Sequence, residues 1–252
     1  MQSYGFVGTG EITAAIVEGL SAGVAEPPAV FLSPRNHDIA HDLAARFPNA
    51  EVCRGNQEVL DRATTVVVAV RPQVVQDVLA DLTFRPGHVV VSAVAGVRLS
   101  LLADRVAPAT RIVRSIPLPT ASRRASRTAM FPDDASARAL FESVGDVVVP
   151  ADEATLATFS AATATFAAHL GQLAAIADWM AGHGVEPADA DAYIAHVYGE
   201  LGRTLAHHDG TIEELAAQHM TPGGINEQFR ATMRDVPTKR GLDEVLARLE
   251  GQ

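Results

Sequence analysis

Cysteine, basic residues and long apolar runs are all scarce in this sequence, and each scarcity excludes a class of protein. The single cysteine, Cys53, cannot form a disulfide within one chain or build a thiolate-rich metal site, so we expect a small buried apolar residue. Only 20 Lys and Arg stand against 30 Asp and Glu, a formal net charge of −10 that argues against binding nucleic acid or an anionic membrane. No apolar run approaches the ~18 residues of a membrane span. No basic, apolar leader precedes the first glycines. We therefore expect a reduced, cytoplasmic protein.

The first part of the chain has the pattern of an α/β domain. Its 252 residues allow one large domain or two modest ones. Short β-branched runs alternate with helical stretches up to Pro150, and the runs are nearly continuous rather than alternating, as in a parallel sheet covered on both faces. These runs span residues 4–7, 30–32, 65–70, 88–92, 111–114 and 146–149. The pattern predicts a Rossmann domain over residues 1–150, with a doubly wound, mostly parallel sheet.

The β-branched runs stop after Pro150. From Asp152 onward the sequence is rich in alanine and is broken at glycine-containing turns, which predicts an all-α C-terminal domain over residues 151–252, with Asp152 capping its first helix. No metal site is predicted. His37 and His41 are four residues apart but lack a third ligand, so surface exposure is the better interpretation. The histidines at 169, 183, 196 and 219 are expected to be either hydrogen-bonded within the fold or solvent-facing, since their spacing does not indicate catalysis.

A glycine-rich turn directly follows the first expected strand and opens the first helix. Its first glycine permits a tight bend, its second lets the backbone approach a pyrophosphate, and the helix N-terminus supplies free N–H groups. Thr13 takes the place of the usual third glycine. This favours dinucleotide binding over a plain turn, with the expected contacts at Gly8, Thr9, Gly10, Glu11 and Ile12.

The end of the second run favours NADP over NAD. An NAD site places an acidic residue here to accept from the ribose hydroxyl, and none occurs before Asp38. Ser33, Arg35 and Asn36 instead offer donors for a 2′-phosphate. NAD remains an alternative, since Arg35 is also compatible with a solvated surface.

Two later loops complete the expected cofactor site. Loops at the carboxyl ends of parallel strands bind ligands in open α/β sheets. The loop Val70-Arg71-Pro72 is expected to line the ribose and nicotinamide, unless it only begins the next helix. Small residues, including Ala95 and Gly96, leave room for the nicotinamide ring. The basic cluster Arg123-Arg124 with Arg127 is better interpreted as a solvated surface than as a group that attracts an acidic substrate or contacts a cofactor phosphate.

Several segments in order carry a resemblance to a known family. They are the Gly8–Gly10 turn, residues 69–73 (Ala-Val-Arg-Pro-Gln), residues 92–97, residues 114–117 (Arg-Ser-Ile-Pro) and residues 221–224 (Thr-Pro-Gly-Gly). Together they resemble the pyrroline-5-carboxylate reductase family over nearly the whole length. The resemblance implies a Rossmann domain, a helical domain that forms a homodimer, and NAD(P)H-dependent reduction of 1-pyrroline-5-carboxylate to L-proline.

The departures from the family concern the substrate side. The family's Met-Pro-Asn is Ile116-Pro117-Leu118, and its glycine-rich segment that helps hold the substrate carboxylate falls at residues 162–168 without its glycines and proline. Asn226 stands where the family has a threonine proposed to hydrogen-bond the reacting nitrogen. The resemblance implies catalytic roles for Asn226 and Thr221, and substrate contacts at Gly223, Gly224, Thr163 and Thr165. For the two threonines at 163 and 165, packing between helices is the alternative.

These observations predict an NADP-dependent reductase of a small-molecule cyclic imine, bound protonated so that its carbon accepts hydride. Orientation of the two reactants is then the main catalytic term. Two alternatives remain. A carbonyl or hydroxy-acid dehydrogenase would need an interdomain lysine, and the second half offers only Lys239. A non-catalytic NADP-binding or regulatory protein would bind the cofactor without oxidising it.

Overall fold

The computed structural model describes residues 3–233 and 238–251, and for Lys239 it describes the backbone alone. The chain forms two compact units, Met1–Ala161 with Val245–Gln252, and Ala162–Glu244. The β-rich region ends near Pro150 as expected. The first unit nevertheless extends to Ala161, because the first helix after the sheet, α7 (Glu153–Thr163), buries Leu156 within it.

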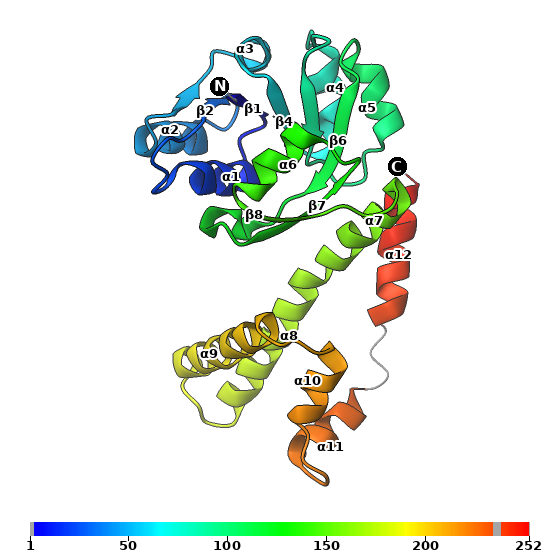
Figure 1. Cartoon of the computed structure of the whole chain (residues 1–252). Helices are drawn as coiled ribbons and strands as arrows, with labels where there is room; N and C mark the ends of the chain where they lie inside the picture. The colour runs from blue at the N-terminus through cyan, green and yellow to red at the C-terminus, as the bar shows by residue number, and fades with distance from the viewer. Residues whose placement is uncertain (1–2, 234–237, 252) are drawn as a thin grey trace. The chain divides into compact units, whose positions relative to one another are not determined.

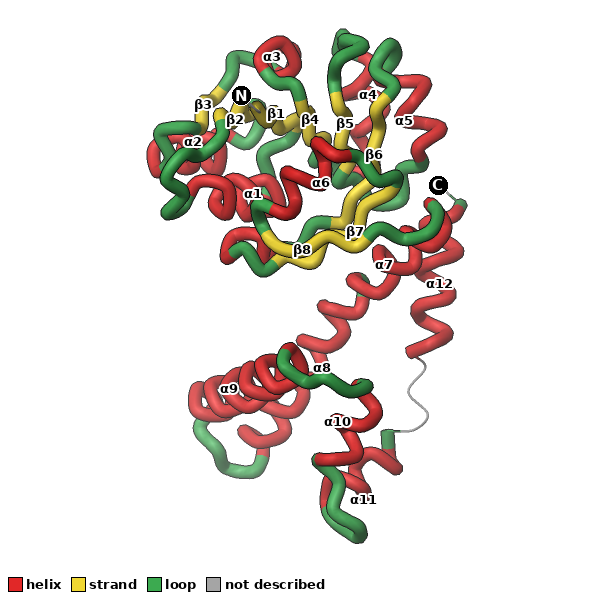
Figure 2. The backbone as a smooth tube through the Cα atoms, viewed as in Figure 1, coloured by secondary structure: helices red, strands yellow, loops and turns green. Residues whose placement is uncertain are grey.

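Eight strands form one sheet in the order β3-β2-β1-β4-β5-β6-β7-β8 (Figure 2). Every neighbouring pair is parallel except β6 and β7. The predicted doubly wound, mostly parallel sheet is therefore confirmed. The chain order reverses between β1 and β4, which makes that position the switch point where such sheets bind ligands. The strands are β1 (Ser3–Val7), β2 (Ala29–Leu32), β3 (Ala50–Val52), β4 (Thr65–Val68), β5 (Val89–Ser92), β6 (Arg111–Ile116), β7 (Ser126–Phe131) and β8 (Gly145–Val148).

The structure differs from the expected strands in two respects. The strands β3 and β7 were not predicted, because β3 has three residues and β7 carries polar Ser126 and Arg127 within its ladder. The run expected to continue to Val70 ends as a strand at Val68. Beyond it, Ala69 still donates its N–H to the carbonyl of Val7 at 2.8 Å, and the chain then turns along the β1–α1 loop.

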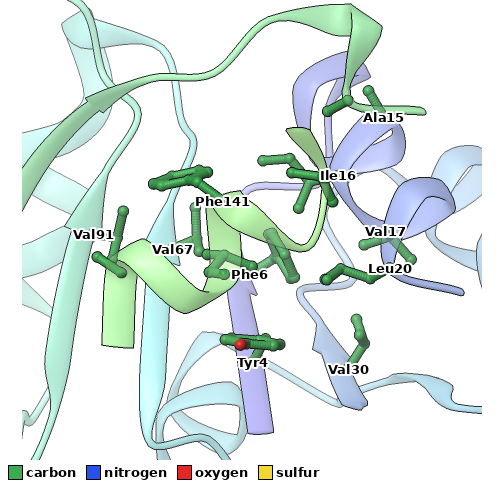
Figure 3. Close-up of a cluster of buried hydrophobic side chains, with 14 of the residues drawn as sticks. Tyr4, Phe6, Ala15, Ile16, Val17, Leu20, Val30, Val67, Val91 and Phe141 are labelled. Atoms are coloured by element: carbon green, nitrogen blue, oxygen red, sulfur yellow. The ribbon is translucent and has the colours of Figure 1, made fainter. Parts of the chain in front are cut away.

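Helices cover both faces of this sheet (Figure 1). On one face, Ile16 of α1 and Phe141 of α6 pack with Phe6, Val67 and Val91 of the strands (Figure 3). On the other face, α3, α4 and α5 bury leucines against β4 and β5. The helices of this layer are α1 (Glu11–Ser21), α2 (His37–Arg46), α3 (Asn56–Arg62), α4 (Val75–Ala80), α5 (Leu99–Val106) and α6 (Ala135–Glu142), with short 3-10 helices at Pro72–Val74 and Pro119–Arg123.

Helix α1 is clamped at its C-terminal end by Arg124. This residue has a left-handed backbone (φ 53°), and its Nε donates to the carbonyl of Gly19 at 2.8 Å while its Nη2 donates to that of Ala22. A Cβ on Gly19 would lie 2.2 Å from the carbonyl oxygen of Ala121, so the helix and this loop are in direct backbone contact. Arg124 is exposed, as expected of the basic cluster, and its guanidinium also bonds the last carbonyls of α1, which the sequence did not indicate. Arg123 and Arg127 are exposed as expected.

The region after the sheet is helical, as predicted. Asp152 caps α7, since its Oδ1 accepts the N–H of Thr155 at 2.7 Å. In the second unit, α8 and α9 pack through a small core of Ala177, Ala190 and Ile194. None of the described helices is long and apolar enough to cross a membrane. The further helices are α8 (Thr165–Gly182), α9 (Pro187–Ala206), α10 (Ile212–Gln218), α11 (Ile225–Thr232) and α12 (Thr238–Glu250).

A buried histidine supports the loop before β5. The His88 side chain is 2% exposed, and its Nδ1 accepts the backbone N–H of Arg85 at 3.1 Å. Its Nε2 lies 3.0 Å from the carbonyl oxygen of Leu60 and also 3.0 Å from Arg85 Nε, which donates to it. Burial lowers the pKa of His88 below its ordinary 6.5, and the neighbouring Arg85 guanidinium lowers it further.

We predict that His88 makes the fold less stable in mild acid. Below about pH 6.5 the unfolded chain binds a proton at this ring that the folded chain does not bind, so the free energy of unfolding falls as the pH falls. His88→Phe removes this titration and should flatten the loss of stability between pH 6.5 and 5, although it costs hydrogen bonds at every pH. Urea unfolding across pH 5 to 8 measures this, and an identical pH slope in both proteins would contradict the prediction.

Candidate functional site

The β1–α1 turn lies at the switch point of the sheet and has the geometry that a pyrophosphate needs. Gly8 adopts φ +99°, and a Cβ there would lie 2.5 Å from the carbonyl oxygen of Ala69, so only glycine fits. Gly10, the N-cap of α1, has nothing within 4 Å of its Cβ position. No side chain caps α1, so the first N–H groups of the helix, from Glu11 and Ile12, face no internal acceptor from a side chain.

Buried hydroxyl groups hold this turn to the end of β2. The Gly8 N–H donates to Ser33 Oγ at 2.9 Å, and Thr9 Oγ1 donates to the Ser33 carbonyl at 2.7 Å. Thr13 Oγ1 donates to the Gly8 carbonyl at 2.7 Å. The three side chains are at most 3% exposed. Thr13, which stands in the place of the usual third glycine, therefore has a hydrogen-bonding role of its own. Its hydroxyl is the only feature of the sequence that indicates this role.

Ser33 does not present its side chain as the sequence analysis expected. It was expected to donate to a 2′-phosphate, yet its residue is 0% exposed and its hydroxyl is used inside the turn. Ser33 therefore braces the turn. Arg35 and Asn36 are exposed on the following loop, and Arg35 makes no hydrogen bond or ion pair with any residue that the structure describes. Their contact with a 2′-phosphate stays a prediction.

The other expected cofactor loops follow strands that run parallel to β1. Val70-Arg71-Pro72 comes after β4, and Ala95-Gly96 comes after β5, so these loops lie at the carboxyl edge with the glycine turn. A Cβ on Gly8 would meet Val70 Cγ1 at 2.9 Å, which brings the first two loops into contact. Arg71 and Ala95 are exposed, whereas Gly96 is buried with φ +76°.

An ion pair that no sequence pattern indicates connects β6 to the start of α7. Arg114, only 8% exposed in its side chain, donates to Glu153 Oε1 at 2.7 Å. The same oxygen accepts the N–H of Leu99, the first residue of α5, at 2.8 Å. Glu153 therefore neutralises a buried guanidinium and also bonds an otherwise orphaned N–H at a helix start. No sequence motif brings residues 99, 114 and 153 together.

In the second unit, polar groups of the loop before α11 form hydrogen bonds with residues close by in the sequence. Gly223, at φ +73°, donates its N–H to Glu227 Oε2 at 2.7 Å, and Gly224 donates to the Thr221 carbonyl at 2.8 Å. Asn226 Nδ2 donates to the His219 carbonyl at 2.8 Å. Asn226 also lines a mostly apolar groove of about 620 Å³ formed by α9, α10 and α11. The substrate contacts expected of this loop remain predictions.

The threonines expected near the substrate lie where α7 meets α8. Thr163 ends α7 and Thr165 begins α8, and Ala164 between them is itself in the right-handed helical region. Thr165 Oγ1 donates back to the carbonyl of Ala162 at 2.7 Å. The backbone at this junction carries none of the glycines and no proline of the family's corresponding segment. A substrate role for these threonines stays a prediction.

The remaining candidates are structural or solvent-facing. Cys53 is a buried free thiol, as expected. His37 and His41 are exposed, with ring centroids 4.0 Å apart. Among the residues at 3–233 and 238–251, no group of three or more His, Cys, Asp or Glu is placed to hold a metal ion.

We predict that Gly10→Val abolishes dinucleotide binding and leaves the fold intact. The added side chain enters the open space in front of α1, where a pyrophosphate would lie, and meets no protein atom there. Gly8→Val is the matched control, since its Cβ clashes with backbone and it should unfold the domain. Circular dichroism reports folding, and NADPH fluorescence reports binding. A folded Gly10→Val protein that still binds NADPH would refute the assignment.

The comparisons with known proteins agree with this geometry. The family model described as "NADP oxidoreductase coenzyme F420-dependent" matches residues 3–96. The pyrroline-5-carboxylate reductase of Methanosarcina acetivorans is 31% identical over 157 residues, or 58% of each chain. Pyrroline-5-carboxylate reductase 3 of Macaca fascicularis is 34% identical over 45% of this chain, and the match spans 42% of that relative's length. Pyrroline-5-carboxylate reductase 2 of Bacillus subtilis is 22% identical over 93% of this chain and 88% of its own.

Two solved structures that carry the name pyrroline-5-carboxylate or pyrroline carboxylate reductase share the fold over nearly the whole chain. The 1-pyrroline-5-carboxylate reductase of Streptococcus pyogenes superposes with a TM-score of 0.84 at 21% identity, covering 99% of this chain and 98% of that one. The pyrroline carboxylate reductase of Plasmodium falciparum, solved with NADP bound, gives 0.81 at 14% identity, covering 99% and 97%. The chain is therefore similar in sequence to pyrroline-5-carboxylate reductases over about half of their length, 42% and 58% for the two relatives above 30% identity named here, and it shares the fold of such enzymes over nearly its whole length.

Proposed function

We propose that this chain is a cytoplasmic NADPH-dependent reductase of a cyclic imine, with 1-pyrroline-5-carboxylate or a close analogue as substrate. The observation that carries the proposal is the β1–α1 turn: Gly8 closes it against Ala69, and Gly10 leaves open space before an uncapped helix. Relatives that carry the name pyrroline-5-carboxylate reductase support the reaction class.

NADP is the cofactor that the residues fit best. The stretch from Ser33 to Asn36 contains no carboxylate to accept from a ribose hydroxyl. Its exposed Arg35, which has no hydrogen bond or ion pair to the residues that the structure describes, is suited to a phosphate. A structural neighbour from Plasmodium falciparum was solved with NADP bound. NAD use remains compatible with the pyrophosphate turn, which contacts a part common to both cofactors.

Bound NADPH would supply the hydride, and the chain would position the reactants. The turn at Gly8–Gly10 would hold the pyrophosphate, while Arg71 and the small residues Ala95 and Gly96 would leave room for the nicotinamide. The imine would bind as its protonated form, whose positive nitrogen makes the carbon a better hydride acceptor. No side chain then has to deliver a proton during the reaction.

Asn226 is suited to hold the iminium nitrogen through its oxygen. The amide Nδ2 is engaged by the His219 carbonyl at 2.8 Å, which fixes the amide orientation and leaves Oδ1 as an acceptor. An iminium N–H is a donor, so Oδ1 and not Nδ2 would contact it. The Nδ2 group keeps a second N–H, but an N–H cannot accept a hydrogen bond from the iminium, so the contact needs Oδ1.

We predict that Asn226→Leu lowers kcat by about 10²–10³-fold on the best imine and keeps NADPH affinity, since it removes a contact made mainly in the transition state. Asn226→Asp should retain more activity, because its carboxylate still accepts from the iminium. NADPH oxidation over a panel of pyrroline carboxylates, simple cyclic imines and keto acids measures this. Turnover of keto acids alone would support a dehydrogenase. NADPH binding with no turnover would support a non-catalytic binder. The lysine that a dehydrogenase would need, Lys239, has a side chain that lies outside the described residues.

We also propose that the chain is a homodimer through its helical unit. Asp178 is the only formally charged residue among the 18 of α8, and Ala177 is its only buried one. Its large apolar side chains Phe166, Leu170 and Trp179 are 54%, 64% and 63% exposed. A helix that is apolar around its circumference is normally buried, so a second copy of this chain is the occupant that we propose.

Leu170→Glu should convert the dimer to a monomer, because it places a charge in the apolar contact without touching the core of its own chain. Sedimentation equilibrium should give twice the chain mass for the parent and one chain mass for the variant. Ser100→Glu, which adds the same charge to exposed α5 in the other unit, should stay dimeric. A monomeric parent protein would contradict the proposal.

A further inference from the structure

The hydroxyl groups around the glycine turn form a network whose direction is fixed by its geometry. The hydroxyl of Thr9 donates its one proton to the Ser33 carbonyl oxygen at 2.7 Å. The contact of 3.1 Å between the two hydroxyl oxygens must therefore use the proton of Ser33 Oγ. Ser33 Oγ in turn accepts the Gly8 N–H at 2.9 Å. Each proton has one acceptor, and the network needs no water to complete it.

Every polar group of Ser33 is engaged, so this residue joins two strands and the turn. Its N–H donates to the Phe6 carbonyl on β1 at 3.0 Å, its hydroxyl bonds Gly8 and Thr9, and its carbonyl accepts from Thr9. The carbonyl of Gly8 is held separately by Thr13 at 2.7 Å. Both peptide groups of the left-handed glycine are therefore fixed from outside the turn.

The network connects the two places where the proposed cofactor carries phosphate. The turn that Thr9 belongs to would meet the pyrophosphate, and the loop that starts at Ser33 carries Arg35 two residues later. A ligand that spans both loops binds best when their separation is set before binding, since ordering them afterwards costs affinity. Neither Thr9 nor Ser33 is exposed enough to touch a ligand with its side chain, at 3% and 0%.

We propose that Thr9 and Ser33 are positioning residues, which hold the pyrophosphate turn and the Arg35 loop in a fixed relation so that the two phosphate positions of NADPH are recognised together. The proposal rests on the proposed cofactor use. It assigns to Thr9 a role that is distinct from Gly10, which makes space, and from Arg35, which supplies charge.

Thr9→Val and Thr9→Ser form the matched pair that tests this role. Valine keeps the shape of threonine without its hydroxyl, and serine keeps the hydroxyl. Each lost hydrogen bond should raise the dissociation constant roughly two- to tenfold, and Thr9→Val removes the two bonds of Thr9 Oγ1. Thr9→Val should therefore weaken NADPH binding about 10- to 30-fold, while Thr9→Ser stays within about threefold of the parent. Dissociation constants are measured for NADPH and NADH by fluorescence titration, on proteins shown to be folded by circular dichroism at the titration temperature.

A double-mutant cycle with Arg35→Ala separates positioning from general stability. In the parent background, Thr9→Val should lower the affinity for NADPH more than the affinity for NADH, because only NADPH uses both loops. In the Arg35→Ala background this excess should disappear. Losses that are equal for both cofactors, or strictly additive with Arg35→Ala, would overturn the coupling. A Thr9→Ser protein as impaired as Thr9→Val would overturn the hydroxyl role. A parent protein that binds neither cofactor would overturn the proposed function itself.

Discussion

The close approach of Gly8 to the carbonyl of Ala69 is the constraint on which the rest of the cofactor site depends. It lets β1 and β4 lie side by side at the point where the strand order reverses, and it starts α1 directly behind the turn. A side chain at this position would separate the two strand ends. The open space at Gly10 and the uncapped start of α1 follow from that placement.

Polar contacts fix α1 at both of its ends, buried at the N-terminal end and more exposed at the C-terminal end. At the N-terminal end, hydroxyl groups of Thr9, Thr13 and Ser33 bond the turn. At the C-terminal end, Arg124 bonds the last carbonyls. Apolar packing is non-directional and does not by itself fix the rotation of a helix or the orientation of a peptide. Directional bonds add that precision, which a backbone site for phosphate requires.

The two units differ in how completely they bury their apolar residues. The sheet unit has an extensive core on each face, with leucines, valines and phenylalanines at 0% exposure. In the helical unit, the described buried cluster is small, comprising Ala177, Ala190 and Ile194, and aromatic side chains such as Trp179 stay exposed. This contrast supports the proposed dimer, since a helical unit of this composition gains most of its burial from a second copy.

The amino-acid sequence by itself determined the elements whose signals are local. The β-branched runs gave most strands, the two glycines located the phosphate turn, and Asp152 marked the start of the helical region, since periodicity, backbone freedom and capping act over a few residues. The tertiary structure decided where side chains point. Ser33 faces inward instead of toward a phosphate, the exposed Arg124 also bonds a carbonyl of α1, and Asn226 donates an N–H to the His219 carbonyl. Each of these depends on a partner that the chain brings near only by folding, with Arg124 and Gly19 separated by 105 positions. A hydrogen bond is set by the distance and direction of both groups, and sequence spacing specifies neither.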